Sequence, residues 1–216
     1  AEAHQAITGG HFSPRYNIAP TQSVPVLRQW AGRRALEFLR WGLMPRHRDD
    51  DRGPPLINAR AETIAEKPTF KESFFRRRCI VPATGFYEWL AEGGFKIPHL
   101  VRAVDGQWFG MAGIWDRRRG ESGLVESFTV VTCPAQGEMQ SIHDRMPVIL
   151  SLNEQALWLD PATSLTTLHG FMLGRTARAL TLEIVSDRVN SVRYDDIGCQ
   201  SPAPSKAAEF QQQSLF

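Results

Sequence analysis

Short runs rich in Val, Ile, Phe and Trp recur along the chain, each bounded by Gly, Pro or Asp. Apolar runs closed by turn-forming residues are typical of β-strands. Nine such runs at short spacing predict a mostly antiparallel β architecture. The strands are expected at Val24–Gln29, Leu36–Trp41, Cys79–Pro82, Gly85–Trp89, His99–Ala103, Trp108–Ile114, Ser127–Thr132, Pro147–Leu150 and Leu182–Val185.

Helical patterns are fewer, and one has clear ends. Ser151 followed by Glu154 is a capping box, which predicts a helix start, and Asp160-Pro161 ends that helix. Pro68 interrupts another helical stretch. Whole or partial helices are expected at Asn153–Leu159, Ala162–Leu173, Ala61–Arg77 and Pro134–Ile142.

Length and composition narrow the class of protein. The 216 residues, 42% of them apolar, suit one large domain or two small ones with a sizeable core. We find no apolar run of about 18 residues and no signal-peptide core, so we expect no membrane span and a cytoplasmic location. The polar segment after Gly198 predicts a folded domain over 1–198 and a disordered tail over 199–216.

Cysteine and charge patterns argue against several other classes. Cys79, Cys133 and Cys199 form no CxxC pair and predict no disulfide framework, and the histidines show no metal-ligand spacing with them, so no metal is expected. The net charge of +2 does not by itself indicate a nucleic-acid partner. Basic clusters at Arg46–Arg48 and Arg76–Arg78 are compatible with solvated loops.

Glu88 is the first candidate for chemistry. Strand alternation over Gly85–Trp89 places Phe86 and Glu88 on one face and Tyr87 and Trp89 on the other. A carboxylate flanked by aromatics is expected to be desolvated, which raises its pKa and suits it to proton transfer near neutral pH. An edge-strand glutamate that faces water is at least as compatible with this pattern.

Three further polar residues stand in otherwise apolar or turn-rich sequence. His143, beside Asp144-Arg145, could titrate near neutrality or could simply hydrogen-bond the turn before Pro147. Asn58 and Arg60 would share one face of a strand and could hold a polar ligand such as a phosphate. They could equally form a buried hydrogen-bond pair that stabilises loops.

Five motifs stand in a fixed order along the chain. They are RYNIAP at Arg15–Pro20, WG-x-x-P at Trp41–Pro45, INAR-x-ET at Ile57–Thr63, R-C-x-x-P-x-x-G-F-Y-E-W at Arg78–Trp89 and IHDRMP at Ile142–Pro147. Together they resemble one known family, the SRAP (SOS response-associated peptidase) family. The resemblance runs from about Arg15 to Val192, and several separate motifs at family-like spacing make it highly specific.

The resemblance implies an α+β fold with a mostly antiparallel, β-barrel-like core, a few flanking helices and a positively charged DNA groove. It implies a cofactor-free monomer, associated with the nucleoid, that acts in the DNA-damage response. Family members bind single-stranded DNA and covalently capture abasic sites. A cysteine exposed by removal of the initiator methionine forms a Schiff base through its α-amine, and its thiol then closes a thiazolidine ring.

The resemblance also assigns expected roles by position in the motifs. Asn58 would position the cysteine amine, Glu88 would shuttle protons, and His143 would help to open the sugar ring. Arg60 would contact a phosphate. Residues expected to line or support the DNA groove are Asn17, Pro20, Trp41, Thr132, Asp144 and Arg145.

The start of the chain departs from the family. Members begin Met-Cys-Gly-Arg, whereas this chain begins AEAHQAITGG. The three cysteines present cannot substitute, because only an N-terminal residue offers both an amine and a thiol. Either the N-terminal segment is absent from this chain, which we favour because the rest of the site is present, or the member is degenerate. The 216-residue chain itself is expected to bind DNA without forming the thiazolidine.

Two alternatives and one extra partner remain open. The chain could be a non-catalytic single-stranded-DNA-binding module, or a thiol peptidase, an activity that we interpret as self-removal of the initiator methionine. The last residues, QQSLF, resemble a bacterial sliding-clamp-binding peptide, in which Gln212 would precede the apolar anchor Leu215-Phe216. An arbitrary polar tail end is the competing interpretation.

Overall fold

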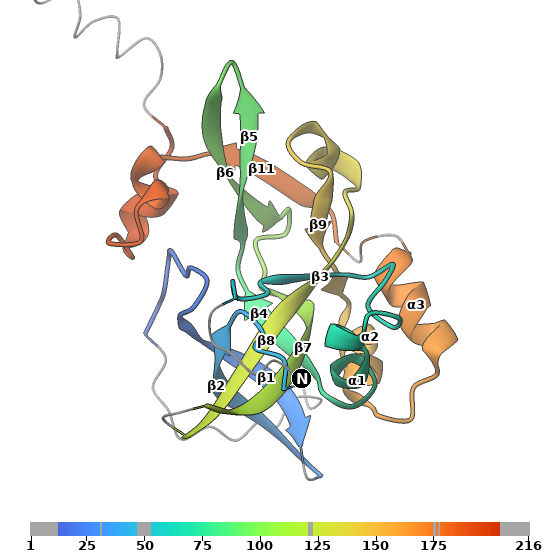
Figure 1. Ribbon diagram of the computed structural model, residues 1–216. Coiled ribbons are helices and arrows are strands. Elements are labelled where there is room, and N and C mark those ends of the chain that lie inside the picture. The colour runs from blue at the N-terminus through green and yellow to red at the C-terminus, as the bar shows by residue number, and fades with distance from the viewer. Residues whose placement is uncertain are drawn as a thin grey trace, which may run out of the picture.

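The computed structural model describes residues 13–30, 32–46, 53–120, 123–174, 176 and 178–203. Eleven strands dominate this part of the chain (Figure 1). They are β1 (Ser23–Trp30), β2 (Arg33–Trp41), β3 (Asn58–Arg60), β4 (Arg78–Ala83), β5 (Phe86–Glu92), β6 (Phe95–Ala103), β7 (Phe109–Gly120), β8 (Gly123–Pro134), β9 (Arg145–Pro147), β10 (Ile149–Leu150) and β11 (Leu180–Ile184). The helical elements are α1 (Pro68–Arg76), α2 (Leu152–Leu159) and α3 (Leu165–Leu173), with 3₁₀ turns η1 (Gly137–Ser141), η2 (Asp187–Asn190) and η3 (Ile197–Gln200).

The larger sheet closes on itself as a five-stranded barrel. Its hydrogen-bonded order is β7-β4-β1-β2-β8, and β8 returns to pair with β7. Four of these contacts are antiparallel, but the β2–β8 contact is parallel. Closure removes the open edges of the five strands and leaves an interior filled by side chains, among them the fully buried Trp115 and Phe128. The predicted mostly antiparallel, barrel-like α+β fold is confirmed.

Three short strands extend the barrel at its rim. β10 pairs with β7, while β3 and β9 both pair with the end of β8. The second sheet, β11-β6-β5, is antiparallel and stands beyond this rim, at the top of Figure 1. Its two faces pack differently: Phe86 and Leu90 contact the main core, whereas Tyr87 and Trp89 contact a small cluster that includes Cys199. The alternation expected over Gly85–Trp89 is therefore confirmed.

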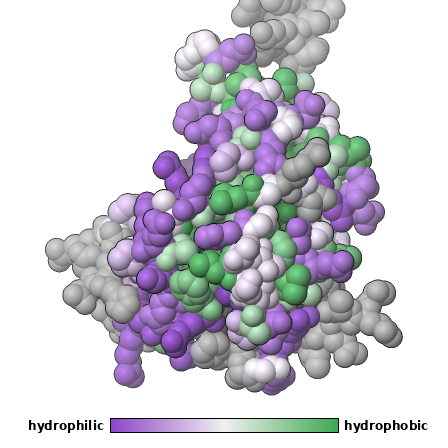
Figure 2. All heavy atoms as spheres, turned by 90° about the vertical axis from the view of Figure 1, so that its right-hand side faces the viewer, coloured by the Kyte–Doolittle hydropathy of each residue, from purple (hydrophilic) through white to green (hydrophobic). Residues whose placement is uncertain are grey.

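The helices cover one side of the barrel (Figure 1). Figure 2 looks onto this side, where apolar and polar side chains are interspersed. Trp158 of α2 is fully buried and its indole N–H donates to the carbonyls of Cys79 and Gly113, on β4 and β7, at 3.0 and 3.2 Å. Truncation of such a buried aromatic commonly costs about 3–5 kcal/mol, so this residue is a principal anchor of α2.

Local sequence explains where the helices begin. The Ser151 side chain accepts from the Glu154 amide at 3.4 Å, and Glu154 accepts from the Ser151 amide at 2.7 Å, so the predicted capping box is present. Pro68 is the first residue of α1, a position where its missing N–H has no helical acceptor to lose. The residues before it, from Ala61, form turns and not the helix that we considered.

The WG-x-x-P motif has a steric basis. Gly42 has a φ of 110°, and a Cβ built there would lie 2.5 Å from Cβ of Pro55. Its amide donates to the Phe128 carbonyl at 2.8 Å, just past the parallel β2–β8 contact. Glycine is therefore required where the chain leaves β2.

The C-terminal boundary lies later than expected. Cys199 is buried in η3, and the Ala203 amide donates to Ile184 at the end of β11, so the packed structure continues past Gly198. The candidate clamp-binding residues Gln212, Leu215 and Phe216 lie outside the described residues. None of the described helices has the length and hydropathy of a membrane span.

Candidate functional site

The end of β8 gathers the predicted site residues from two directions. β3 runs parallel to it, with Asn58 opposite Val130 and Arg60 opposite Thr132. Ala59 between them is fully buried, whereas Asn58 and Arg60 are exposed on one face, as predicted. The amide and the guanidinium are thus available together to a ligand at the barrel rim.

On the other side of β8, β9 carries the IHDRMP motif. Thr132, which is buried, pairs with Pro147 of β9 as well as with Arg60 of β3. This one residue of β8 therefore connects the two short strands. His143 lies in the turn between η1 and β9, and its side chain is 38% exposed. Its ring Nδ1 accepts a hydrogen bond from the backbone N–H of Arg145 at 2.9 Å.

Glu88 reaches the site from the second sheet. It lies on β5, opposite the buried His99 of β6, and is itself half-buried. Burial raises the pKa of its carboxyl above the ordinary value, while the charge of His143 and the Trp89 N–H oppose the rise and Asp144 adds to it. Glu88, on β5, and His143, in the turn before β9, therefore interact electrostatically.

Arg145 is held in an ion pair. Its guanidinium binds both oxygens of Glu62, the glutamate that follows Arg60 and Ala61, with the Nη2–Oε2 distance at 2.9 Å. Nη2 also donates to the Thr132 carbonyl at 2.7 Å. The hydrogen bonds between the two side chains lower the pKa of Glu62 and raise the pKa of Arg145. Arg145 therefore links β9 to the segment after β3.

Trp41 and Pro20 support the rim. The Trp41 indole N–H donates to the Ile57 carbonyl at 3.0 Å, directly before β3, and its ring stacks on Phe128. The backbone of Trp41 also binds Thr21 and Gln22, which follow the exposed Pro20. These contacts hold the backbone at Ile57, directly before Asn58.

Asn17 lies in a different environment. Its side chain is buried, and its amide nitrogen donates to the carbonyls of Val189, Ser191 and Tyr194 at 3.0–3.1 Å. These contacts account for Asn17 as an anchor of the C-terminal segment. A direct role in binding DNA stays a prediction.

The assembled groups suit reactions that move protons at a carbonyl or sugar carbon. A carboxyl with a raised pKa can donate a proton at a pH where an ordinary glutamate is ionised, and an imidazole beside it can give or take a second one. All three cysteines are buried, and burial raises the pKa of Cys79 and Cys133. A thiolate nucleophile from Cys79 or Cys133 is therefore disfavoured.

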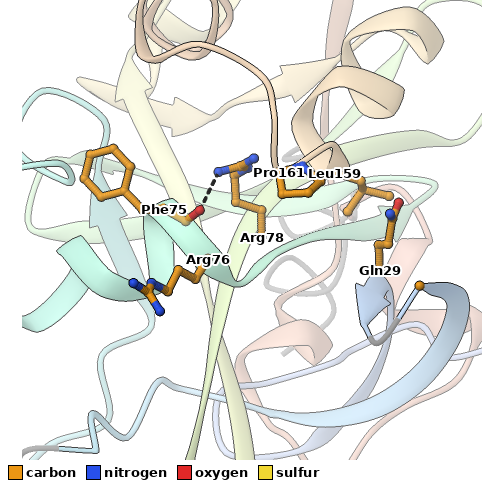
Figure 3. Close-up of a pocket in the computed structure, with 7 residues that line it drawn as sticks. Gln29, Phe75, Arg76, Arg78, Leu159 and Pro161 are labelled. Atoms are coloured by element: carbon orange, nitrogen blue, oxygen red, sulfur yellow. Dashed lines mark hydrogen bonds between the residues drawn. The ribbon is translucent and has the colours of Figure 1, made fainter.

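A cavity lies apart from these residues. It measures about 150 Å³ and is lined by Gln29, Gly32, Phe75, Arg76, Arg78, Leu159 and Pro161 (Figure 3). None of the predicted site residues contributes to it. In the described part of the chain, no group of three His, Cys, Asp or Glu residues is placed to hold a metal.

Sequence reasoning missed the role of Glu62. The residue stands inside the INAR-x-ET motif, and a charged residue two positions from Arg60 was the available signal. Its partner lies 83 residues away, so the pair became visible in the folded chain. Asp195, which accepts from the backbone amides of Tyr16 and Asn17 at 2.6 and 2.8 Å, was missed for the same reason.

Comparison with known proteins adds independent findings. The family model "SOS response associated peptidase (SRAP)" matches residues 1–192. The chain is 37% identical over 191 residues to "Abasic site processing protein YobE" of Bacillus subtilis, covering 87% of each chain. It is 33% identical to "Abasic site processing protein HMCES" of Gallus gallus, covering 89% of this chain and 67% of that one. A crystal structure of a protein from Bacteroides thetaiotaomicron is similar with a TM-score of 0.74 and 28% identity, covering 84% of this chain and 82% of that one.

Proposed function

The chain belongs to the SRAP family, and from that premise we propose that it processes abasic sites in DNA. The observation that carries the proposal is the electrostatic interaction of Glu88, whose pKa is raised by burial, with His143, together with the exposure of Asn58 and Arg60 on β3. The names of its relatives, which are abasic site processing proteins, support the substrate.

We further propose that the reaction is covalent capture in single-stranded DNA. An N-terminal amine attacks the aldehyde carbon of the open sugar, and loss of water leaves an imine. The thiol of the same N-terminal cysteine then adds across the C=N bond, its sulfur to carbon and its proton to nitrogen, which closes a thiazolidine ring. The linkage shields the lesion from strand cleavage and can reverse.

In this proposal each of the described site residues has a separate role. Glu88 protonates the departing hydroxyl during imine formation, a role that its raised pKa favours. His143 assists the opening of the sugar ring, and Asn58 orients the attacking amine. Arg60, exposed beside Asn58, binds a backbone phosphate and makes binding salt-dependent. Removal of the initiator methionine would expose the cysteine.

The test is a denaturing gel with a single-stranded oligonucleotide that contains one abasic site. Protein made from the full open reading frame, with its N-terminal residue established by intact mass, is expected to shift the DNA covalently. An abasic analogue without the aldehyde should bind but not shift. An N-terminal cysteine with no covalent shift would count decisively against the proposal.

A second candidate is single-stranded-DNA binding without chemistry. Burial of all three cysteines favours it for the 216-residue chain as printed. This chain is expected to retard single-stranded DNA in a native gel, with affinity that falls as salt rises, and to give no band in the denaturing gel. Binding to a sliding clamp through Gln212, Leu215 and Phe216 is a separate proposal, and deletion of 212–216 should abolish it in a pull-down.

A further inference from the structure

The Glu62–Arg145 ion pair links the segment after β3 to β9, and both of these strands pair with the end of β8. Glu62 follows β3 and Arg145 opens β9, and the two side chains meet with both carboxylate oxygens bound. The arginine side chain is 19% exposed and the glutamate 37%, so the pair is shielded on the arginine side. Bidentate geometry of this kind restrains direction as well as distance.

Arg145 is held through both its side chain and its backbone. Its guanidinium also binds the Thr132 carbonyl and hydroxyl at 2.7 and 3.3 Å, and its residue pairs with Pro134 of β8. The backbone carbonyl of the preceding residue, Asp144, accepts a hydrogen bond from the Ala135 amide at 2.9 Å. The backbone N–H of Arg145 is therefore held at a defined place above the end of β8.

That N–H favours one of the two neutral tautomers of His143. It donates to Nδ1 at 2.9 Å, which in a neutral imidazole leaves the proton on Nε2. Two competing acceptors lie close to the same nitrogen, the Arg145 carbonyl at 3.1 Å and an Asp144 carboxylate oxygen at 3.2 Å. Either would favour the opposite tautomer, with the proton on Nδ1. A small shift of the Arg145 backbone would change which neighbour prevails.

We propose that Glu62 is a positioning residue, which acts through Arg145 to hold His143 as the Nε2–H tautomer. The inference rests on the role proposed above for His143, because that tautomer keeps a proton on the nitrogen facing away from the turn. The charged groups that interact with the ring are Glu88 from β5 and Asp144 from its own segment. Glu62 interacts with Arg145 and Arg60, on the β3 side.

The test replaces Glu62 by Gln in the full chain and observes the histidine rings by long-range ¹H–¹⁵N correlation spectra. His143→Gln assigns the His143 signals, and Glu66→Gln, an exposed glutamate in the same segment, is the matched control. Wild type and Glu66→Gln should show the Nε2–H pattern at a pH where His143 is neutral. Glu62→Gln should show a substantial Nδ1–H population, and Glu62→Asp, which keeps the carboxylate, should fall between.

A second measurement links the tautomer to chemistry. In the cysteine-bearing protein, Glu62→Gln should slow capture of abasic DNA about tenfold while Kd for single-stranded DNA changes by less than about twofold. An unchanged tautomer in a folded Glu62→Gln protein overturns the proposal, and so does a tautomer change with an unaltered capture rate. Tighter DNA binding with a steeper salt dependence and an unchanged tautomer would show instead that Glu62 competes with a phosphate for Arg145. A tautomer change in protein that never captures DNA would sink the proposed function and leave the role of Glu62 in positioning the ring intact.

Discussion

At the scale of single residues, Glu88 combines two properties that usually conflict. It is half-buried, so ionisation is costly, yet it interacts electrostatically with His143, which opposes the rise in its pKa. Burial is the larger effect, and the pKa rises. A carboxyl in this state remains protonated at a pH where surface glutamates have lost their proton, as a general acid requires.

Glu88→Gln should keep the shape of the neutral acid and remove the transferable proton. We expect capture of abasic DNA to slow by about 10²-fold or more, with single-stranded-DNA affinity nearly unchanged. Glu92→Gln, an exposed glutamate on the same strand, is the control. A Glu88→Gln protein with the wild-type capture rate would remove Glu88 from the mechanism.

The same substitution predicts a pH dependence of stability. Because the folded pKa of Glu88 is raised above its ordinary value of 4.5, its favourable contribution is complete below that value and is lost as pH rises through the folded pKa. The unfolding free energy of Glu88→Gln relative to wild type should therefore be greater at about pH 8 than at about pH 4. Urea unfolding at both pH values checks this, and a gap that narrows with rising pH would contradict it.

At the scale of elements, Arg78 joins two helix ends. Its guanidinium donates to the carbonyls of Phe74 and Phe75 at the end of α1, and to those of Trp158 and Asp160 at the end of α2. Figure 3 shows the bond to Phe75. Burial lowers its pKa, and the charge of Asp160 opposes this effect. The helix C-termini, with their partial negative charge, also favour the guanidinium. The R that opens the R-C-x-x-P motif is thus explained by packing.

Arg78→Met should destabilise the fold by about 2–4 kcal/mol, because it leaves carbonyls at both helix ends without their donors. Arg78→Lys should fall between, since one ammonium cannot reach all of these oxygens. The exposed neighbour Arg76→Lys serves as the control and should change the unfolding free energy by less than about 0.5 kcal/mol. Equal effects of Arg78→Met and Arg76→Lys in urea unfolding would refute the structural account.

Most strand positions were predictable because they depend on local alternation, but β3 was not among the expected strands. The two faces of Phe86–Trp89 and the shared face of Asn58 and Arg60 followed from side-chain period alone, whereas the exposure of that face did not. The parallel β2–β8 contact and the Glu62–Arg145 pair could not be derived in that way, because both join residues far apart in the chain. Motif resemblance supplied the candidate site residues, but it could not separate Asn17, which is buried among carbonyls, from residues at the rim.

At the scale of the whole molecule, the two ends of the described chain hold each other. Asp195 accepts from the backbone amides of Tyr16 and Asn17, Asn17 binds three carbonyls between Val189 and Tyr194, and the Tyr87 hydroxyl donates to the Tyr16 carbonyl at 2.7 Å. Tyr87 is the neighbour of Glu88 on β5. These hydrogen bonds form a clasp between the two ends of the described chain. Through Tyr87, the clasp holds the sheet that carries Glu88 against the start of the described chain.

Asn17→Ala should open this clasp. We expect a loss of about 2–3 kcal/mol in unfolding free energy, because three carbonyls lose a buried donor, and faster amide hydrogen exchange at Val189 and Cys199. Asn153→Ala, on the exposed face of α2, is the matched control and should leave both measurements unchanged. If Asn17→Ala weakens single-stranded-DNA binding while stability and exchange stay at wild-type values, Asn17 is a DNA contact, as its motif suggests, and the clasp does not depend on its amide. If stability falls and DNA affinity at a temperature well below unfolding is retained, the residue acts at a distance from the DNA, through the sheet that carries Glu88.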